Sequence, residues 1–108
     1  MEQEYTLVPN LAELVEAIQP DSIVSRTFYK SKRLKGIAFG FDAGQELSEH
    51  TSTQTGIIQI VQGEAVVTLG EDRHELSAGS WVRMTPNLKH SVYAKTPLIM
   101  LLLMVDAD

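Results

Sequence analysis

Histidine is the residue type of this chain best suited to metal binding or acid–base chemistry, because the 108 residues include three histidines and no cysteine. The absence of cysteine excludes disulfide bonds, thiolate zinc sites and thiol catalysis. By this reasoning a metal has to rest on imidazole nitrogen and on oxygen. His74 stands within a run of charged residues, 71–75, where a solvated turn is expected. His50 and His90 remain as the candidate pair.

Each of these two histidines follows a glycine at a defined distance. Five residues separate Gly44 from His50, ten separate Gly79 from His90, and Gly63 closes the first pattern. These spacings resemble the two sequence motifs of the cupins, a family of small jelly-roll barrels, many of them bacterial and single-domain. The resemblance implies an all-β fold, the cupin-type double-stranded β-helix (jelly-roll barrel), with one short N-terminal helix.

The resemblance also implies a metal site, although an incomplete one. In the family, two histidines and a glutamate of the first motif, with the histidine of the second, bind one divalent metal inside the barrel. Two of these four ligand positions are occupied here by His50 and His90. The other two are occupied by Ser52 and Gly56. The implied cofactor is a divalent metal (Zn, Fe, Mn or Ni) held by two histidines, with water or substrate oxygens completing the site.

A ligand pocket is expected around the two histidines. Strand alternation directs Ile58 and Ile60 into the barrel and Gln59 away from it. The predicted pocket residues are His50, Ser52, Ile58, Ile60, Met84 and His90. This mainly apolar lining suits a small hydrophobic or aromatic molecule better than a sugar phosphate. A neutral oxygen from Gln54 or Gln59 could complete a metal site.

Two classes of function agree with these residues, and the sequence leaves catalysis open. The first is a metal-dependent enzyme; the resemblance implies oxygenation, isomerisation or lyase chemistry, with the metal as Lewis acid or oxygen-binding centre. The second is a metal-free module that binds or senses a small molecule in a degenerated cupin site. Ser52 lies two residues from His50, but no acid is placed to orient that imidazole as in a catalytic triad.

The elements that position the histidines are expected to be short β-strands. Runs of apolar and β-branched residues between Gly- and Pro-containing turns predict strands at 22–29, 34–41, 57–61, 65–69, 81–84, 91–94 and 98–105. A helix of about two turns is predicted over 11–18, capped by Asn10. The chain is expected to be one domain, with an N-terminal segment over 1–21 and the barrel over 22–108.

Two of the predicted strands, 57–61 and 98–105, are apolar on both faces. A strand with one face in water would alternate with polar residues, so the outer face of this sheet must be covered. One short helix cannot cover two strands. We therefore expect a homodimer in which the second copy supplies the cover.

Composition limits the partners and the location of the protein. The formal net charge is −5, which argues against binding to a nucleic-acid backbone. The longest apolar run has eight residues, whereas a membrane-spanning helix needs about twenty. The acidic start of the chain is unlike a signal peptide. The expected protein is cytoplasmic, binds a small molecule, and contacts neither nucleic acid nor membrane.

Overall fold

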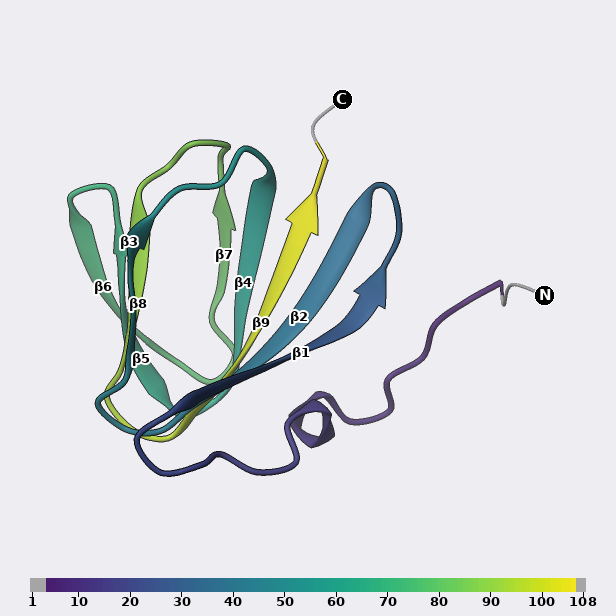
Figure 1. Ribbon diagram of the computed structural model, residues 1–108. Helices are drawn as coiled ribbons and strands as arrows, with labels where there is room; N and C mark the ends of the chain where they lie inside the picture. Colours follow the sequence, from purple (N-terminus) through teal and green to yellow (C-terminus); the bar gives the residue numbers. More distant parts are fainter. Residues whose placement is uncertain (1–3, 107–108) are drawn as a thin grey trace.

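The computed structural model describes residues 4–106 as two facing antiparallel β-sheets (Figure 1). The strands are β1 (Ile23–Lys30), β2 (Leu34–Phe41), β3 (Glu46–His50), β4 (Thr55–Gln62), β5 (Glu64–Leu69), β6 (Asp72–Ser77), β7 (Trp81–Met84), β8 (His90–Ala94) and β9 (Leu98–Val105). One sheet has five strands in the order β1-β2-β9-β4-β7, and the other has four in the order β3-β8-β5-β6. The prediction of an all-β jelly-roll barrel is confirmed.

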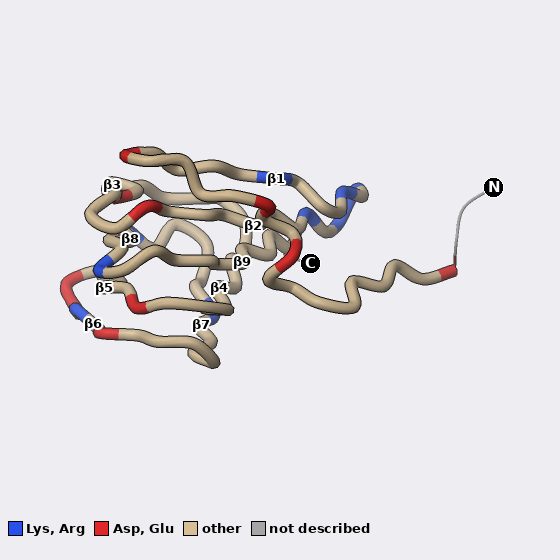
Figure 2. The backbone as a smooth tube through the Cα atoms, turned by 90° about the horizontal axis from the view of Figure 1, so that it is seen from below, with Lys and Arg blue, Asp and Glu red and all other residues tan. Residues whose placement is uncertain are grey.

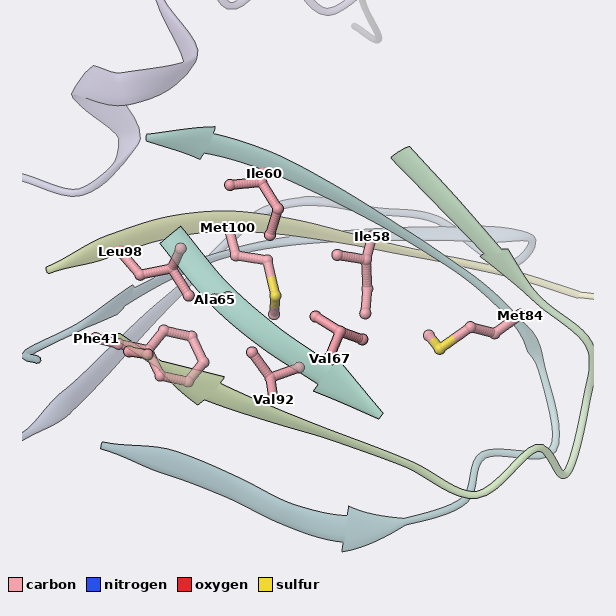
Figure 3. Packing of buried hydrophobic residues seen from close by; sticks show 10 residues of the cluster. Phe41, Ile58, Ile60, Ala65, Val67, Met84, Val92, Leu98 and Met100 are labelled. Carbon is pink, nitrogen blue, oxygen red and sulfur yellow. The ribbon is translucent and has the colours of Figure 1, made fainter. Parts of the chain in front are cut away.

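The core lies between the two sheets and follows the alternation of side chains. On β4, Ile58 and Ile60 are buried between the sheets, whereas Gln59 faces outward. Figure 3 shows these isoleucines meeting side chains of the four-stranded sheet, among them Val67 and Val92. Burying one such side chain stabilises the fold by about 1.5–3 kcal/mol. This packing fixes the distance between the sheets and hence the width of the barrel.

The N-terminal helix is shorter than predicted. Only η1 (Leu11–Leu14) is helical, and it is a single 3-10 turn. The side chain of Asn10 accepts a hydrogen bond from the backbone N–H of Ala12 at 3.1 Å, so the predicted cap is present. Val15 already has extended backbone angles, with φ −112° and ψ 109°. The prediction of a two-turn helix over 11–18 was therefore wrong.

Packing on the sheet explains why the helix stops. A Cβ atom on Gly40 would lie 2.6 Å from Cγ1 of Val15 and 3.0 Å from Cγ1 of Ile18. Both side chains therefore rest directly on the backbone of β2, where the glycine leaves room for them. A second helical turn would lift this apolar contact away from the sheet, and the contact favours the extended conformation.

The N-terminal segment covers part of the outer face of the five-stranded sheet. Leu14, Ala38 and Leu101 form a second buried cluster there, with Phe28 packed against it. Nη1 of Arg26 donates a hydrogen bond to the carbonyl oxygen of Leu14 at 3.4 Å and attaches the segment to β1. Much of the cover that we had assigned to a second copy is thus supplied by the chain itself.

Two strands were not predicted, β3 and β6. Their sequences, ELSEH and DRHELS, are mostly polar because these strands form the two edges of the four-stranded sheet. Leu47 and Leu76 are the residues of β3 and β6 that pack against the core. His74 is exposed as expected, but it lies in β6 opposite Val67 and not in a turn.

Along residues 4–106 we find no helix with the length and apolar character that spanning a membrane requires.

Two turn glycines have nearly the same backbone angle but different surroundings. Gly63, between β4 and β5, has φ 95°, and Gly79, before β7, has φ 96°. A Cβ atom on Gly63 would collide with the carbonyl oxygen of Pro97. A Cβ atom on Gly79 would have open space around it among the described residues. Replacing either glycine by another residue would therefore strain the left-handed backbone, but only a side chain at position 63 would also collide with Pro97.

We predict that Gly63→Ala destabilises the protein more than Gly79→Ala. Gly79→Ala should cost about 1–2 kcal/mol through backbone strain alone. Gly63→Ala should cost roughly 3–4 kcal/mol because the collision with Pro97 is added. Urea denaturation followed by circular dichroism measures both free energies of unfolding. Equal losses in the two variants would contradict the assigned contact.

Candidate functional site

The structure brings His50 and His90 together at one end of the barrel. His50 is the last residue of β3, His90 is the first residue of β8, and the two are paired directly across the strands. Their ring centroids are 4.2 Å apart, with 59° between the ring planes. His90 is buried, whereas His50 is exposed. The pair therefore lies at a mouth of the barrel, with one ring inside and one at the rim.

Each imidazole is held by a contact of the same kind, between its Nδ1 and the backbone carbonyl oxygen of the residue two positions earlier. Nδ1 of His50 lies 2.7 Å from the carbonyl oxygen of Ser48, and Nδ1 of His90 lies 2.9 Å from the carbonyl oxygen of Leu88. A carbonyl oxygen can only accept a hydrogen bond, so we assign the proton to Nδ1 in each ring. In the neutral ring Nε2 then carries a free lone pair. Such a contact is the usual support of a metal-binding or hydrogen-bonding histidine.

A cavity of about 470 Å³ opens beside the two rings. Its lining, apart from the histidines, consists of uncharged residues, some with hydroxyl or amide groups and others with apolar side chains. The lining residues are His50, Thr51, Ser52, Thr53, Gln54, Gly56, Met84, Thr85, Leu88, His90, Leu102 and Met104. The volume is within the range of small-molecule sites, about 300–1,000 Å³.

Four of the six predicted pocket residues line this cavity: His50, Ser52, Met84 and His90. Ile58 and Ile60 point inward as expected, but they are buried in the closed core below the cavity. The reason is the position of the opening, which lies at the start of β4, whereas the two isoleucines follow further along that strand.

The two glutamines of the prediction are placed differently. Gln54 lines the cavity, but its amide nitrogen donates a hydrogen bond to Oδ1 of Asp106. Its backbone N–H is bound by the hydroxyl oxygen of Ser52 at 3.1 Å. Gln59 lies opposite Trp81 on the outer face of the sheet, away from the histidines. The loop between β3 and β4 is thus organised by its own polar contacts.

The donor set fits a metal only in part. Among residues 4–106 no group of three or more His, Cys, Asp or Glu side chains converges on one point. Catalytic zinc usually has three protein ligands, and non-haem iron two histidines and a carboxylate. His50 and His90 offer two free imidazole nitrogens, so the residues present fit a two-histidine site whose remaining ligands come from elsewhere.

The cavity residues that sequence reasoning missed come mainly from the far wall, Leu102 and Met104 of β9 together with Thr85 and Leu88 after β7. Strand alternation from Leu98 would have directed Met104 inward. Its place beside the histidines, however, depends on the register of β9 against β4, which the sequence does not specify.

A larger hollow of about 1070 Å³ lies elsewhere, between the N-terminal segment and the β1–β2 hairpin. Its lining holds Tyr5, Phe28 and two lysines, Lys30 and Lys32. These lysines belong to the basic turn that Figure 2 shows in blue at one tip of the molecule. The described residues that line this hollow include no histidine, so we place the functional site at the histidine cavity.

The ion pair between Lys95 and Glu75 also lies away from the site. Nζ of Lys95 is 2.8 Å from Oε1 of Glu75, at the opposite end of β8 from His90. Hydrogen bonding and charge attraction from Lys95 lower the pKa of Glu75, and Glu75 in turn raises the pKa of Lys95. Both side chains are well solvated, and such surface pairs contribute little to stability.

The sequence over residues 38–106 matches the family model described as the cupin domain. This chain belongs to the cupin family. Among solved structures, a conserved protein of unknown function from Streptococcus pyogenes is 28% identical, covers 100% of this chain and 92% of its own, and has a TM-score of 0.84. A cupin superfamily protein from Desulfitobacterium hafniense DCB-2 is 26% identical, with 99% and 95% coverage and a TM-score of 0.85. No curated protein matches the sequence.

The assigned tautomers of this cupin can be tested directly. We predict that His50 and His90 are both protonated on Nδ1 when neutral, because each Nδ1 donates to a carbonyl oxygen. Nitrogen-15 NMR of the imidazole rings distinguishes a protonated ring nitrogen from one with a lone pair. Exposed His74 provides the reference signal in the same spectrum. A protonated Nε2 in neutral His50 or His90 would contradict the assignment.

Proposed function

We propose that this cupin binds a small, mainly apolar molecule in the cavity beside His50 and His90, through a divalent metal held by the two Nε2 atoms. The observation that carries the proposal is the pair of Nδ1 contacts to Ser48 and Leu88. They turn both rings into fixed lone-pair donors on one cavity. A bound metal would act as a Lewis acid toward an oxygen of the ligand.

The lining of the cavity supports this class of ligand. It holds no Lys, Arg, Asp or Glu among the described residues, so a sugar phosphate would lack a counter-charge from the protein. The hydroxyl groups of Thr51, Ser52, Thr53 and Thr85 can bind one or two polar atoms of the ligand. Met84 and Leu102 offer apolar contact to the rest of it.

The chemistry of the donors ranks the candidate divalent metals. Imidazole suits Zn, Ni and Fe, whereas Mn prefers carboxylate and other oxygen ligands. The described residues that line the cavity include two imidazoles and no carboxylate. We therefore expect Zn or Ni to bind more tightly than Mn. The proposal concerns binding, because this described lining adds no further acid or base to the histidines.

A metal-free binding module is the second candidate. It is favoured by Ser52 and Gly56, which stand at two of the four ligand positions implied by the family motif. In that case the two Nε2 atoms accept hydrogen bonds from the ligand, and the same cavity residues provide the apolar contact.

We predict that the protein binds one equivalent of Zn²⁺ and that His50→Ala and His90→Ala each weaken this binding at least about tenfold, since each removes one ligand. Elemental analysis and calorimetric titration of untagged protein measure the effect. His74→Ala is the matched control, because it removes an exposed imidazole outside the cavity. Trace metal only, in wild-type protein offered Mn, Fe, Ni and Zn, favours the metal-free module. Unchanged binding in both cavity variants places the metal elsewhere.

We also propose that a second copy of the chain covers the remaining outer face of the five-stranded sheet. Ile57 and Leu103 are paired across β4 and β9 and are only half-buried. Trp81, on neighbouring β7, is 59% exposed. On this face Trp81 lies opposite Gln59 and Ile57 lies opposite Arg83, so the apolar side chains are accompanied by polar ones. An apolar patch with polar residues beside it is typical of an interface, and a two-fold axis would bury the same patch on both copies.

We predict that light scattering gives twice the chain mass of 12.0 kDa at micromolar concentration. Trp81→Glu should shift the protein to the monomer, because it places a charge in the apolar contact. Tyr93→Glu, on an exposed aromatic residue of the other sheet, is the matched control and should leave the dimer intact. A wild-type protein of about 12 kDa would refute the dimer.

A further inference from the structure

Two methionines flank the glycine that replaces the family's glutamate. In the sheet, Gly56 of β4 is paired with Met84 of β7 on one side and with Met104 of β9 on the other. Residues directly opposite one another in neighbouring strands share a face. The row Met84–Gly56–Met104 therefore runs across three strands on the inner face of the sheet, at the level of the cavity.

The end of the Met84 side chain occupies the space above this glycine. A Cβ atom on Gly56 would lie 2.9 Å from Cε of Met84, closer than real side chains come. The volume in which a glutamate at position 56 would begin is thus already filled by a thioether methyl group. The end of the Met84 side chain thus lies over the backbone of the position at which the family motif has a glutamate.

Both methionines face the histidine pair across one cavity. Met84 is 3% exposed, and Figure 3 shows its side chain extending from β7 into the space between the sheets. Met84, Met104, His50 and His90 all line the same 470 Å³ cavity. The five-stranded sheet thus supplies two thioether sulfurs and the four-stranded sheet two imidazoles.

We propose that this cavity is a site for a soft monovalent cation, Cu(I), held by Nε2 of His50 and His90 and by the sulfur atoms of Met84 and Met104. The proposal rests on the proposed function, because it uses the same two imidazoles. Thioether sulfur selects Cu(I) among biological metals, and imidazole also binds copper well. Iron and manganese gain little from sulfur that carries no charge.

The charge of the site supports the same cation. All four donors are neutral, and the cavity contains no carboxylate among its described lining residues. Because the cost of bringing an ion out of water grows with its charge, a monovalent ion enters this uncharged lining at lower cost than a divalent ion, which needs oxygen donors from its bound ligand. The two thioethers thus add a preference for a soft monovalent ion to the histidine site.

Methionines also fill gaps in apolar cores, and this role must be separated from metal binding. Met100 provides the internal comparison. It lies on the same strand and the same inward face as Met104, is 1% exposed, and belongs to the same buried cluster as Met84, but it does not line the cavity. A core-filling role would make all three methionines behave alike toward a soft cation, whereas a site would single out Met84 and Met104.

The first test uses Ag(I), a redox-inert substitute for Cu(I), and protein with carbon-13 methyl groups on methionine. We expect the methyl signals of Met84 and Met104 to shift with one equivalent of Ag(I), while that of Met100 stays in place. Signals are assigned with single Met→Leu variants. Absence of any shift at Met84 and Met104 would overturn the proposal, and the titration itself is carried out on wild-type protein.

The second test measures Cu(I) affinity under anaerobic reducing conditions against bicinchoninate, a chromophoric chelator. Met84→Leu and Met104→Leu conserve volume and should weaken Cu(I) binding by about tenfold or more each. They should leave Zn²⁺ binding unchanged, and Met100→Leu should alter neither metal. His50→Ala should weaken both metals.

The two proposals fail in different ways. Normal Cu(I) affinity in both Met84→Leu and Met104→Leu would overturn the copper site while the histidine site still stands. Normal affinity for both metals in His50→Ala and His90→Ala would remove the common basis of both proposals.

Discussion

The packing of inward side chains along β4 and β9 holds the two sheets together, and the site is formed where this packing ends. At one end Phe41, Ile60 and Leu98 are completely buried and close the barrel. At the other end position 56 contributes no side chain of its own, and only the end of Met84 lies over it. Beyond that contact the sheets remain apart because the core below them fixes their distance. The space left over is the cavity beside the histidines. The core therefore determines both the stability of the barrel and the location of its mouth.

The parts of the fold that depend on interactions between residues close in the chain could be predicted from the sequence. The apolar strands and their glycine turns were visible in the sequence, whereas β3 and β6 were not, because these two edge strands of the four-stranded sheet carry mostly polar side chains. The two-turn helix was wrong for a different reason. Its amphipathic pattern was genuine, but Val15 and Ile18 use their apolar face in an extended conformation over Gly40. That contact joins residues far apart in the chain, so no local pattern could reveal it.

The site could be predicted only in part, again because some of its contacts join residues far apart in the chain. The glycine–histidine spacings indicated His50 and His90, and their pairing across β3 and β8 agrees with that expectation. Because the chain has no cysteine, the sequence led us to expect only nitrogen and oxygen atoms as metal ligands. Met104 became visible as a neighbour of Gly56 only with the register of three strands. The sequence shows that position 56 lacks the glutamate of the family motif, whereas the methionines beside that position are recognised only in the three-dimensional structure.

The two walls of the cavity differ in how firmly they are held. β8 has a neighbour on each side, whereas β3 is an edge strand with one partner and an irregular register just before His50. Opening β3 breaks one ladder, and opening β8 would break two. The strand that carries His90 is accordingly held more firmly than the strand that carries His50, although each ring is oriented by its own backbone contact. Entry and exit of whatever the cavity holds would take place on the β3 side, so residues 46–50 would set the rate of exchange, while β8 contributes chiefly to affinity.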